Sequence, residues 1–572
     1  MEFTKLSHNA LPLSTPSIGP VRAAEPIDEP PRRGRKSRPQ ARLRALVEDA
    51  PVSDWASLSA DLAGASARAT ELDDPIEWRI HDRTHVEFAI DYPIAERPIE
   101  QVWEAYFFVP ESLRLHESTY TKKAIYDDLH SYVRFAVPEL PFAELSQSNA
   151  GSQLEALKRS LELSVGKPAD SIESAEAMRS LRLFACMVRA SGLNAIRAIE
   201  REISEPNLEP LSVKRRCSAF VLACTELVRA LRSTIEGATS RGVPDDVACA
   251  TRWVDEDVSL AIEALCADAA VKLEQHAGVD AAVPDLAERV AACAVAEARH
   301  RAEKGYKSVG SADASEREVE HLEFRRHVLK RFTASVLWLT LEVREGASWA
   351  LHILYALAAG MAMGFAVLAS FGTTGVSDNL FRYAMIVVIA YMVKDRLKAF
   401  LQGAFTDWIA KRYPDRLWRI RDRERGHDVG RVHERAGFLP FRSVPEEVLS
   451  VRRSTREHAL EEQARPERVL WHQKEVRVQP ASTTGESHDF RMLTEIFRLN
   501  LAHWLTHTDD PNRKMVFADP TDASIYSAKA KRVYNINVVY RLRSSERDAK
   551  SPWHRIRIVV SRKGIIRIDA IG

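Results

Sequence analysis

The sequence predicts a membrane protein with two transmembrane α-helices in a hairpin. A cytoplasmic α+β unit and a helical bundle precede the hairpin, and a β-rich α+β module follows it. The main observation is an apolar run over residues 347–371 that contains no charged residue. A helix of this length crosses a hydrocarbon core of ~30 Å with some tilt. The other two observations are a shorter apolar run within residues 379–396 and a strand-like alternation near the C-terminus.

The second apolar run is short, and Arg382 and Lys394 bound its uncharged part. A run of this length is also typical of a buried core helix. We expect a second span because both flanking cations can extend to opposite membrane interfaces. Residues 372–381 contain no Lys or Arg, whereas basic residues are frequent before the first run and after the second. This asymmetry predicts that both termini are cytoplasmic.

The composition restricts the class of protein further. The chain has 572 residues and a formal net charge of +1, so its overall charge does not indicate nucleic-acid binding. The six cysteines include no C-x-x-C pair, and we expect reduced thiols in a helical core. The N-terminus lacks the apolar segment of a signal peptide. No cofactor or metal motif is found, and we expect neither group.

Shifts in composition divide the chain into segments at its Pro- and Gly-rich breaks. The segments are a disordered basic and Pro-rich arm (1–70), a small α+β unit (75–145), a helical bundle (150–305), a linker with a helix or strand leading to the membrane (306–345), transmembrane helices (347–371 and 379–396), an amphipathic basic helix (397–428) and a β-rich C-terminal module (430–572).

The N-terminal arm contains a basic cluster over residues 32–44. Such a cluster is most often a solvated segment without a specific role. It is also able to bind the anionic headgroups of an inner leaflet, where each Lys or Arg contributes about 1 kcal/mol. The single Arg-Gly-Arg core resembles a minor-groove hook, but the neutral net charge makes nucleic acid an unlikely partner. We expect membrane lipids as partners, because both spans and their basic flanks contact the bilayer.

Local patterns predict the main elements of the two α+β regions. Residues 84–92 and 531–543 alternate apolar and polar side chains, as strands do. Residues 121–135 and 490–506 show helical spacing, and we expect the second helix to cover the C-terminal sheet. This arrangement predicts that residues 466–572 fold without the rest of the chain.

The candidate polar site lies in the α+β unit, where His116, Glu117, Tyr120 and Lys122 follow Pro110. These residue types are able to perform acid–base chemistry, but an ordinary surface loop has the same composition. His503 and His507 are spaced four apart on the expected helix, as in some metal sites. No third ligand is required by the pattern, and we expect no metal there. Their spacing alone is therefore not treated as a site.

The first apolar run contains small residues at every fourth position, namely Ala356, Gly360 and Gly364. Small side chains in a membrane helix form a groove that allows a second helix to approach closely. The sequence leaves open whether this partner is the second helix of the hairpin or another subunit. We therefore expect these residues to mediate helix packing and a protein partner or self-association.

The sequence also resembles a group of bacterial inner-membrane proteins that have no assigned activity. The resemblance is carried by the Phe-Phe-Val-Pro-Glu-Ser-Leu block at 107–113, by the tyrosine-rich segment 120–135 and by residues 391–396. It implies a bacterial origin, an inner-membrane location and a shared two-helix architecture. It implies no activity or site residue.

These observations favour a membrane-anchored cytoplasmic interaction or sensory scaffold, because two thin spans carry large domains without a catalytic motif. The alternative is an enzyme with an unrecognised active site in residues 75–145. The arrangement of the polar side chains in space would distinguish the two hypotheses.

Overall fold

The computed structural model describes most of the chain after residue 75. The described residues are 76–149, 151–204, 210–275, 283–311, 313–345, 348–371, 380–454, 467–480, 490–519, 521, 524–544 and 551–571. The predicted disordered arm (1–70) lies outside this set. Contacts divide the chain into two units, 1–54 and 55–572, and every described residue belongs to the second unit.

The larger sheet has eight antiparallel strands in the order β14-β13-β12-β3-β8-β7-β6-β5. Its strands are β3 (Ile99–Pro110), β5 (Thr340–Glu345), β6 (Arg416–Arg421), β7 (Asp428–Leu439), β8 (Glu467–Val478), β12 (Tyr534–Ser544), β13 (His554–Ser561) and β14 (Gly564–Ala570). Side chains alternate across the central strand β3. Trp103 and Phe107 enter the main core, while Phe108 packs on the opposite face with Val448 of α12 (Glu446–Arg453). Both faces of this strand are therefore covered.

The smaller sheet has four antiparallel strands in the order β1-β2-β9-β4. Its strands are β1 (Ile76–Ile80), β2 (His85–Pro93), β4 (Leu129–Phe135) and β9 (Met492–Asn500). Aromatic rings join the two sheets, because Phe497 stacks on Phe88 at 4.8 Å and meets Trp103 edge-on at 4.7 Å. Backbone bonds tie both sheet edges, from Leu339 N–H to Val133 O (3.0 Å) and from Ile565 N–H to Arg83 O (2.7 Å).

Strands from the two ends of the chain alternate within both sheets. β3 lies between β8 and β12, and β9 lies between β2 and β4. The regions predicted as separate modules at 75–145 and 430–572 thus build one β structure. A third sheet is the two-stranded hairpin of β10 (Asn512–Asp519) and β11 (Ser524–Lys531).

Two expected helices have a different structure. The segment 121–135 begins as the short helix α3 (Lys122–Asp127), capped by Thr121, and continues as β4. The segment 490–506 is mostly strand β9, followed by a 3-10 turn at His503–Leu505. β9 is buried on both faces, so its apolar residues do not alternate and resemble those of a helix.

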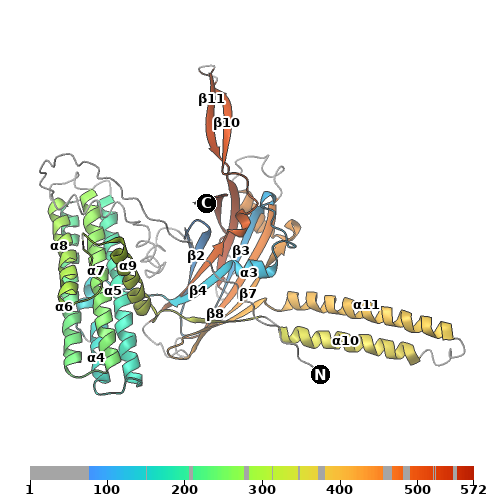
Figure 1. The fold of residues 1–572 in the computed structure, drawn as a ribbon, viewed down its shortest axis with the longest axis horizontal. Coiled ribbons are helices and arrows are strands. Elements are labelled where there is room, and N and C mark those ends of the chain that lie inside the picture. The colour runs from blue at the N-terminus through green and yellow to red at the C-terminus, as the bar shows by residue number, and fades with distance from the viewer. Residues whose placement is uncertain are drawn as a thin grey trace, which may run out of the picture. The chain divides into compact units, whose positions relative to one another are not determined.

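The helical bundle consists of α4 (Gln153–Ser164), α5 (Ile172–Ser204), α6 (Pro210–Ser240), α7 (Asp245–Gln275), α8 (Val283–Glu303) and α9 (Glu316–Ala334). Figure 1 shows these helices lying side by side. α7 is the central helix, since it contacts α5, α6, α8 and α9. Ser315 and Glu318 form a capping box that starts α9.

Three consecutive acidic residues on α7 are buried and point to different neighbouring helices. Asp255 accepts from Arg232 on α6 at 3.0 Å, and Glu256 accepts from Arg325 on α9 at 2.6 Å. Asp257 accepts from Arg189 on α5 at 2.5 Å. Because buried charges require partners, these pairs select the neighbours of α7.

The remaining helices, α10 (Ser348–Phe371) and α11 (Leu380–Arg412), lie side by side (Figure 1). The expected class of a two-span hairpin membrane protein is wrong for this structure. Among the described residues only Trp349–Ala369 forms a helix long and apolar enough to cross a membrane, and its side chains are mostly exposed. α11 is not apolar enough over its length to cross a membrane, because its apolar part continues without a break into Lys394, Asp395 and Arg396.

Candidate functional site

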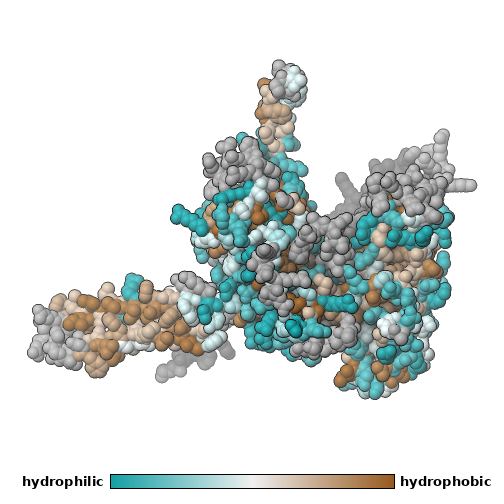
Figure 2. Space-filling model, turned by 180° about the vertical axis from the view of Figure 1, so that it is seen from behind, coloured by the Kyte–Doolittle hydropathy of each residue, from teal (hydrophilic) through white to brown (hydrophobic). Residues whose placement is uncertain are grey.

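The most extensive apolar surface among the described residues covers α10 and the first half of α11. Figure 2 shows the apolar side chains gathered over these two helices. Large exposed side chains include Leu357 (52%), Leu368 (73%) and Val388 (54%). They point in several directions around the pair, whereas a helix that docks on one protein groove needs a single apolar stripe.

A band of charge interrupts this surface on α11. The Lys394 ammonium lies 3.8 Å from the centroid of the Tyr391 ring and 3.4 Å from Asp395. Tyrosine and lysine are frequent at the level of lipid headgroups, where the ring and the stem stay apolar and the charge reaches water. The apolar surface therefore has a polar boundary on α11.

The predicted small-residue motif does not face α11. A Cβ added at Gly360 or Gly364 would meet no atom within 4 Å, and Ala356 is exposed. Ala358 and Ala362 are instead the fully buried small residues of α10. Packing through Ala356, Gly360 and Gly364 thus stays a prediction, and it now concerns a partner other than α11.

The structure does not bring the predicted polar residues together as a site. The His116 imidazole lies 3.5 Å from Glu111, and Glu117 is exposed. Tyr120 is buried and donates to Asp128 at 2.7 Å, while Lys122 donates to Asp415 at 2.7 Å.

Each of these polar side chains serves a local contact. Burial, together with the Asp128 acceptor, raises the pKa of Tyr120, so its hydroxyl stays protonated. Tyr120 also stacks on His503 at 5.2 Å, which places this histidine in an aromatic contact. Residues 116–122 therefore form a turn whose side chains pack against the β structure.

A buried ionic cluster, formed by Glu434, His472, Lys474 and Glu495, lies between the two large sheets. The Lys474 ammonium pairs with Glu495 and donates to Ser131 at 2.7 Å. His472 Nε2 donates to Glu434 at 2.7 Å. All four side chains are at most 2% exposed. No sequence motif marks them, because they come from three strands and have other polar residues beside them in the chain.

The ionisation of the cluster follows from its surroundings. Burial lowers the pKa of His472, although the hydrogen bond to Glu434 opposes this effect. Burial alone would raise the pKa of Glu434, but the Lys474 charge and the His472 bond together lower it. The cluster therefore holds an ionised Glu434 inside the β structure. Lys474 also lies 4.9 Å from the Phe497 centroid, which completes its enclosure.

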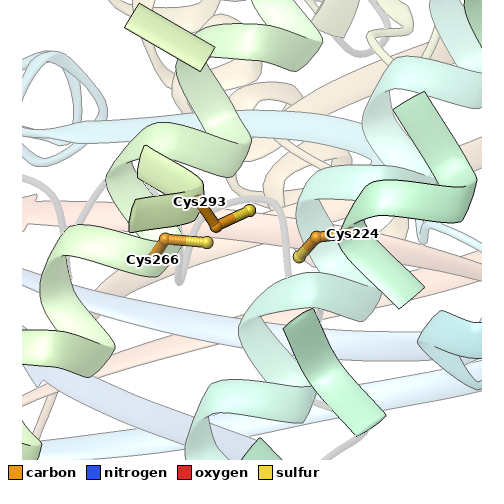
Figure 3. Close-up of side chains that lie close together, drawn as sticks. All are labelled: Cys224, Cys266 and Cys293. Atoms are coloured by element: carbon orange, nitrogen blue, oxygen red, sulfur yellow. The ribbon is translucent and has the colours of Figure 1, made fainter. Parts of the chain in front are cut away.

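Three cysteines meet inside the helical bundle, as Figure 3 shows. Cys224 comes from α6, Cys266 from α7 and Cys293 from α8, and their Sγ atoms all lie within 4.8 Å of one another. Cys224 and Cys266 are fully buried, and Cys293 is partly buried. Among the described residues this is the group of Cys, His or acidic side chains whose ligand atoms converge closely enough to hold a metal ion.

The comparisons with known proteins add no assignment to this geometry. No protein-family model, no curated protein and no solved structure matches the chain.

Proposed function

We propose that the chain is a membrane-associated interaction or sensory scaffold that attaches to a lipid bilayer through α10. The observation that carries this proposal is the exposed apolar surface of that helix. The stretch Trp349–Ala369 has 21 residues, which corresponds to about 31 Å of helix. This length matches the hydrocarbon thickness of a bilayer. The resemblance of the sequence to bacterial inner-membrane proteins makes that membrane the proposed location.

Lipid is favoured over a protein groove by two features. The exposed apolar side chains surround the α10–α11 pair, and Lys394 beside Tyr391 gives α11 a boundary of the kind found at headgroups. The proposal requires attachment through α10 and uses no second span. The β structure and the bundle are then held at the membrane, available to partners.

An enzyme in residues 75–145 is not favoured. His116, Tyr120 and Lys122 each hold a different partner, so no nucleophile, base and substrate position are brought together.

The test is flotation of the full chain with liposomes that contain anionic lipid. Leu357→Asp combined with Met361→Asp places two charges near the middle of α10. Each Asp costs about 2.5–3.5 kcal/mol at the centre of a membrane helix, so the double variant is expected to leave the lipid fraction. The matched control is Val319→Asp with Phe324→Asp, because these apolar residues are similarly exposed on α9.

The proposal is supported if the wild-type chain and the control float while the α10 variant does not. It is overturned if the wild-type chain stays with the soluble fraction, or if both double variants float equally well. Far-ultraviolet circular dichroism should be the same for all three proteins, since the replaced side chains are exposed.

A further inference from the structure

The three-cysteine cluster of the bundle has the features of a ligand set. Its members come from three helices and are distant in sequence, yet their sulfur atoms meet within 4.8 Å (Figure 3). A buried cysteine is often only a small apolar side chain. Cys217 on α6 and Cys186 on α5 are buried in that ordinary way, and neither belongs to the cluster. Burial in an apolar core explains Cys217 and Cys186, but it does not explain why three thiols from three helices meet at one point.

The distances suit a metal held by three sulfurs. At a metal–sulfur distance of ~2.3 Å, three sulfurs around a trigonal ion are about 4.0 Å apart. The observed upper limit of 4.8 Å requires a contraction of less than about 1 Å, which small side-chain rotations supply. No backbone movement is needed to bring the three atoms onto one ion.

A cysteine binds a metal as the thiolate, so an ion held by the three sulfurs would displace thiol protons. The convergence of the three sulfur atoms gives such an ion all of its protein ligands at one point.

The identity of the ligands selects the class of ion. Within the described residues no histidine or carboxylate joins the three sulfurs. Glu297 follows Cys293 by one turn on α8, but its carboxylate is held by Arg232 at 2.6 Å. All-thiolate sets favour soft cations such as Cu(I) and Zn(II), and disfavour Mg(II) and Ca(II), which take oxygen ligands.

We propose that Cys224, Cys266 and Cys293 form an all-sulfur site for one soft d10 metal cation, of the Cu(I) or Zn(II) kind. Cu(I) would be held by the three sulfurs alone, and Zn(II) would add a water as its fourth ligand. Binding joins α6, α7 and α8 at one point and so stabilises the bundle. This inference does not depend on the proposed attachment to a membrane.

The experiment uses the reduced, metal-free full chain titrated with Cu(I) or Zn(II) alone, each against a chelator of known affinity. We expect one ion per chain and a release of protons on binding, because the ligands bind as thiolates. Cys224→Ala, Cys266→Ala and Cys293→Ala should each weaken binding by more than about 100-fold, since losing a ligand exceeds the loss caused by an outer contact. Cys217→Ala is the matched control, because this buried thiol lies on the same helix as Cys224.

A second measurement remains valid if a variant fails to fold. Bound metal should slow alkylation of Cys293 in the wild-type chain, while Cys249, which is also partly buried, should react at an unchanged rate. The proposal is overturned if neither ion binds at one per chain, if binding survives in Cys293→Ala, or if metal leaves the alkylation of Cys293 unchanged.

Discussion

Lys474→Met should strongly destabilise the β structure, because it removes the cation from the buried ionic cluster. Lys474 is fully buried on β8, and its ammonium faces Glu495 and Glu434, the latter at 3.9 Å. Methionine has a similar length, so packing is largely kept while two buried carboxylates lose their counter-charge. Breaking a buried ion pair by removing one partner costs about 3–5 kcal/mol.

The assay should be local, because a chain with several folded parts does not unfold in one transition. Hydrogen exchange of the β8 amides, read by mass spectrometry, reports the free energy of opening that strand. A loss of 3–5 kcal/mol corresponds to a fall in protection of about two to four orders of magnitude. Arg477→Met on the same strand is the control, since Arg477 is exposed.

The dependence on pH gives an independent check. In the wild-type chain the pKa of Glu434 is lowered, so its contribution to stability is present above the unfolded pKa and is lost as the pH falls through the folded pKa. In Lys474→Met the uncompensated carboxylates gain protons more readily, and the defect should shrink as the pH is lowered from 7 to 5. Replacing Glu495 by Gln in the same chain should recover part of the loss. Equal protection in Lys474→Met and Arg477→Met would refute the reasoning.

Three further predictions follow from other parts of the fold. Asp255→Asn should destabilise the bundle by about 1–3 kcal/mol in local hydrogen exchange, since Arg232 and His300 lose their shared carboxylate while Arg232 keeps its pair with Glu297. Burial alone would raise the pKa of Asp255, but these partners lower it, so the stability that the wild-type carboxylate adds should be lost in acid. An unchanged bundle would contradict this prediction. A fragment of residues 428–572 should show no cooperative thermal transition by circular dichroism, because β3 is missing between β8 and β12; a cooperative melt would show that the module is independent. Gly564→Ala should cost about 1–3 kcal/mol more than Gly426→Ala in local hydrogen exchange, because both glycines have positive φ but only a Cβ at 564 would meet the backbone oxygen of Arg83. Equal costs would remove this contact from the explanation.

The sequence was most informative where one face of a strand is buried. The alternation in 84–92 marked β2, where Val86, Phe88 and Ile90 are fully buried and Ala89 and Asp91 are not. It failed for β9, because burial on both faces removes the alternation. It also failed for the second apolar run, since a short uncharged stretch does not define a span when the helix continues into charged residues.

The three-cysteine cluster was missed because its spacing follows no local motif. A signal for it was nevertheless present in the helical pattern. Cys266 lies 9 residues before the end of α7 at Gln275, and Cys293 lies 10 residues after the start of α8 at Val283. In an antiparallel helix pair such residues lie side by side along the helix axes. The position of Cys224 along the bundle axis could not be predicted in this way, because it depends on how α6 packs against α7 and α8.

The order of the elements shows that the helical regions are insertions into the β structure. Phe135 N–H bonds to Leu337 O at 2.9 Å, so the chain leaves and re-enters the β structure at neighbouring residues around the bundle. Glu345 pairs with Arg416 in the same way around α10 and α11. Insertions with adjacent ends are tolerated because the host strands still pair without them.

This arrangement makes the short strand β5 (Thr340–Glu345) the covalent link between the two insertions. It follows α9 closely, precedes α10 and is held by β6 alone within the sheet order. An edge strand has a neighbour on one side only, so β5, like β14 at the other edge, should open at lower cost than the central strands of the sheet.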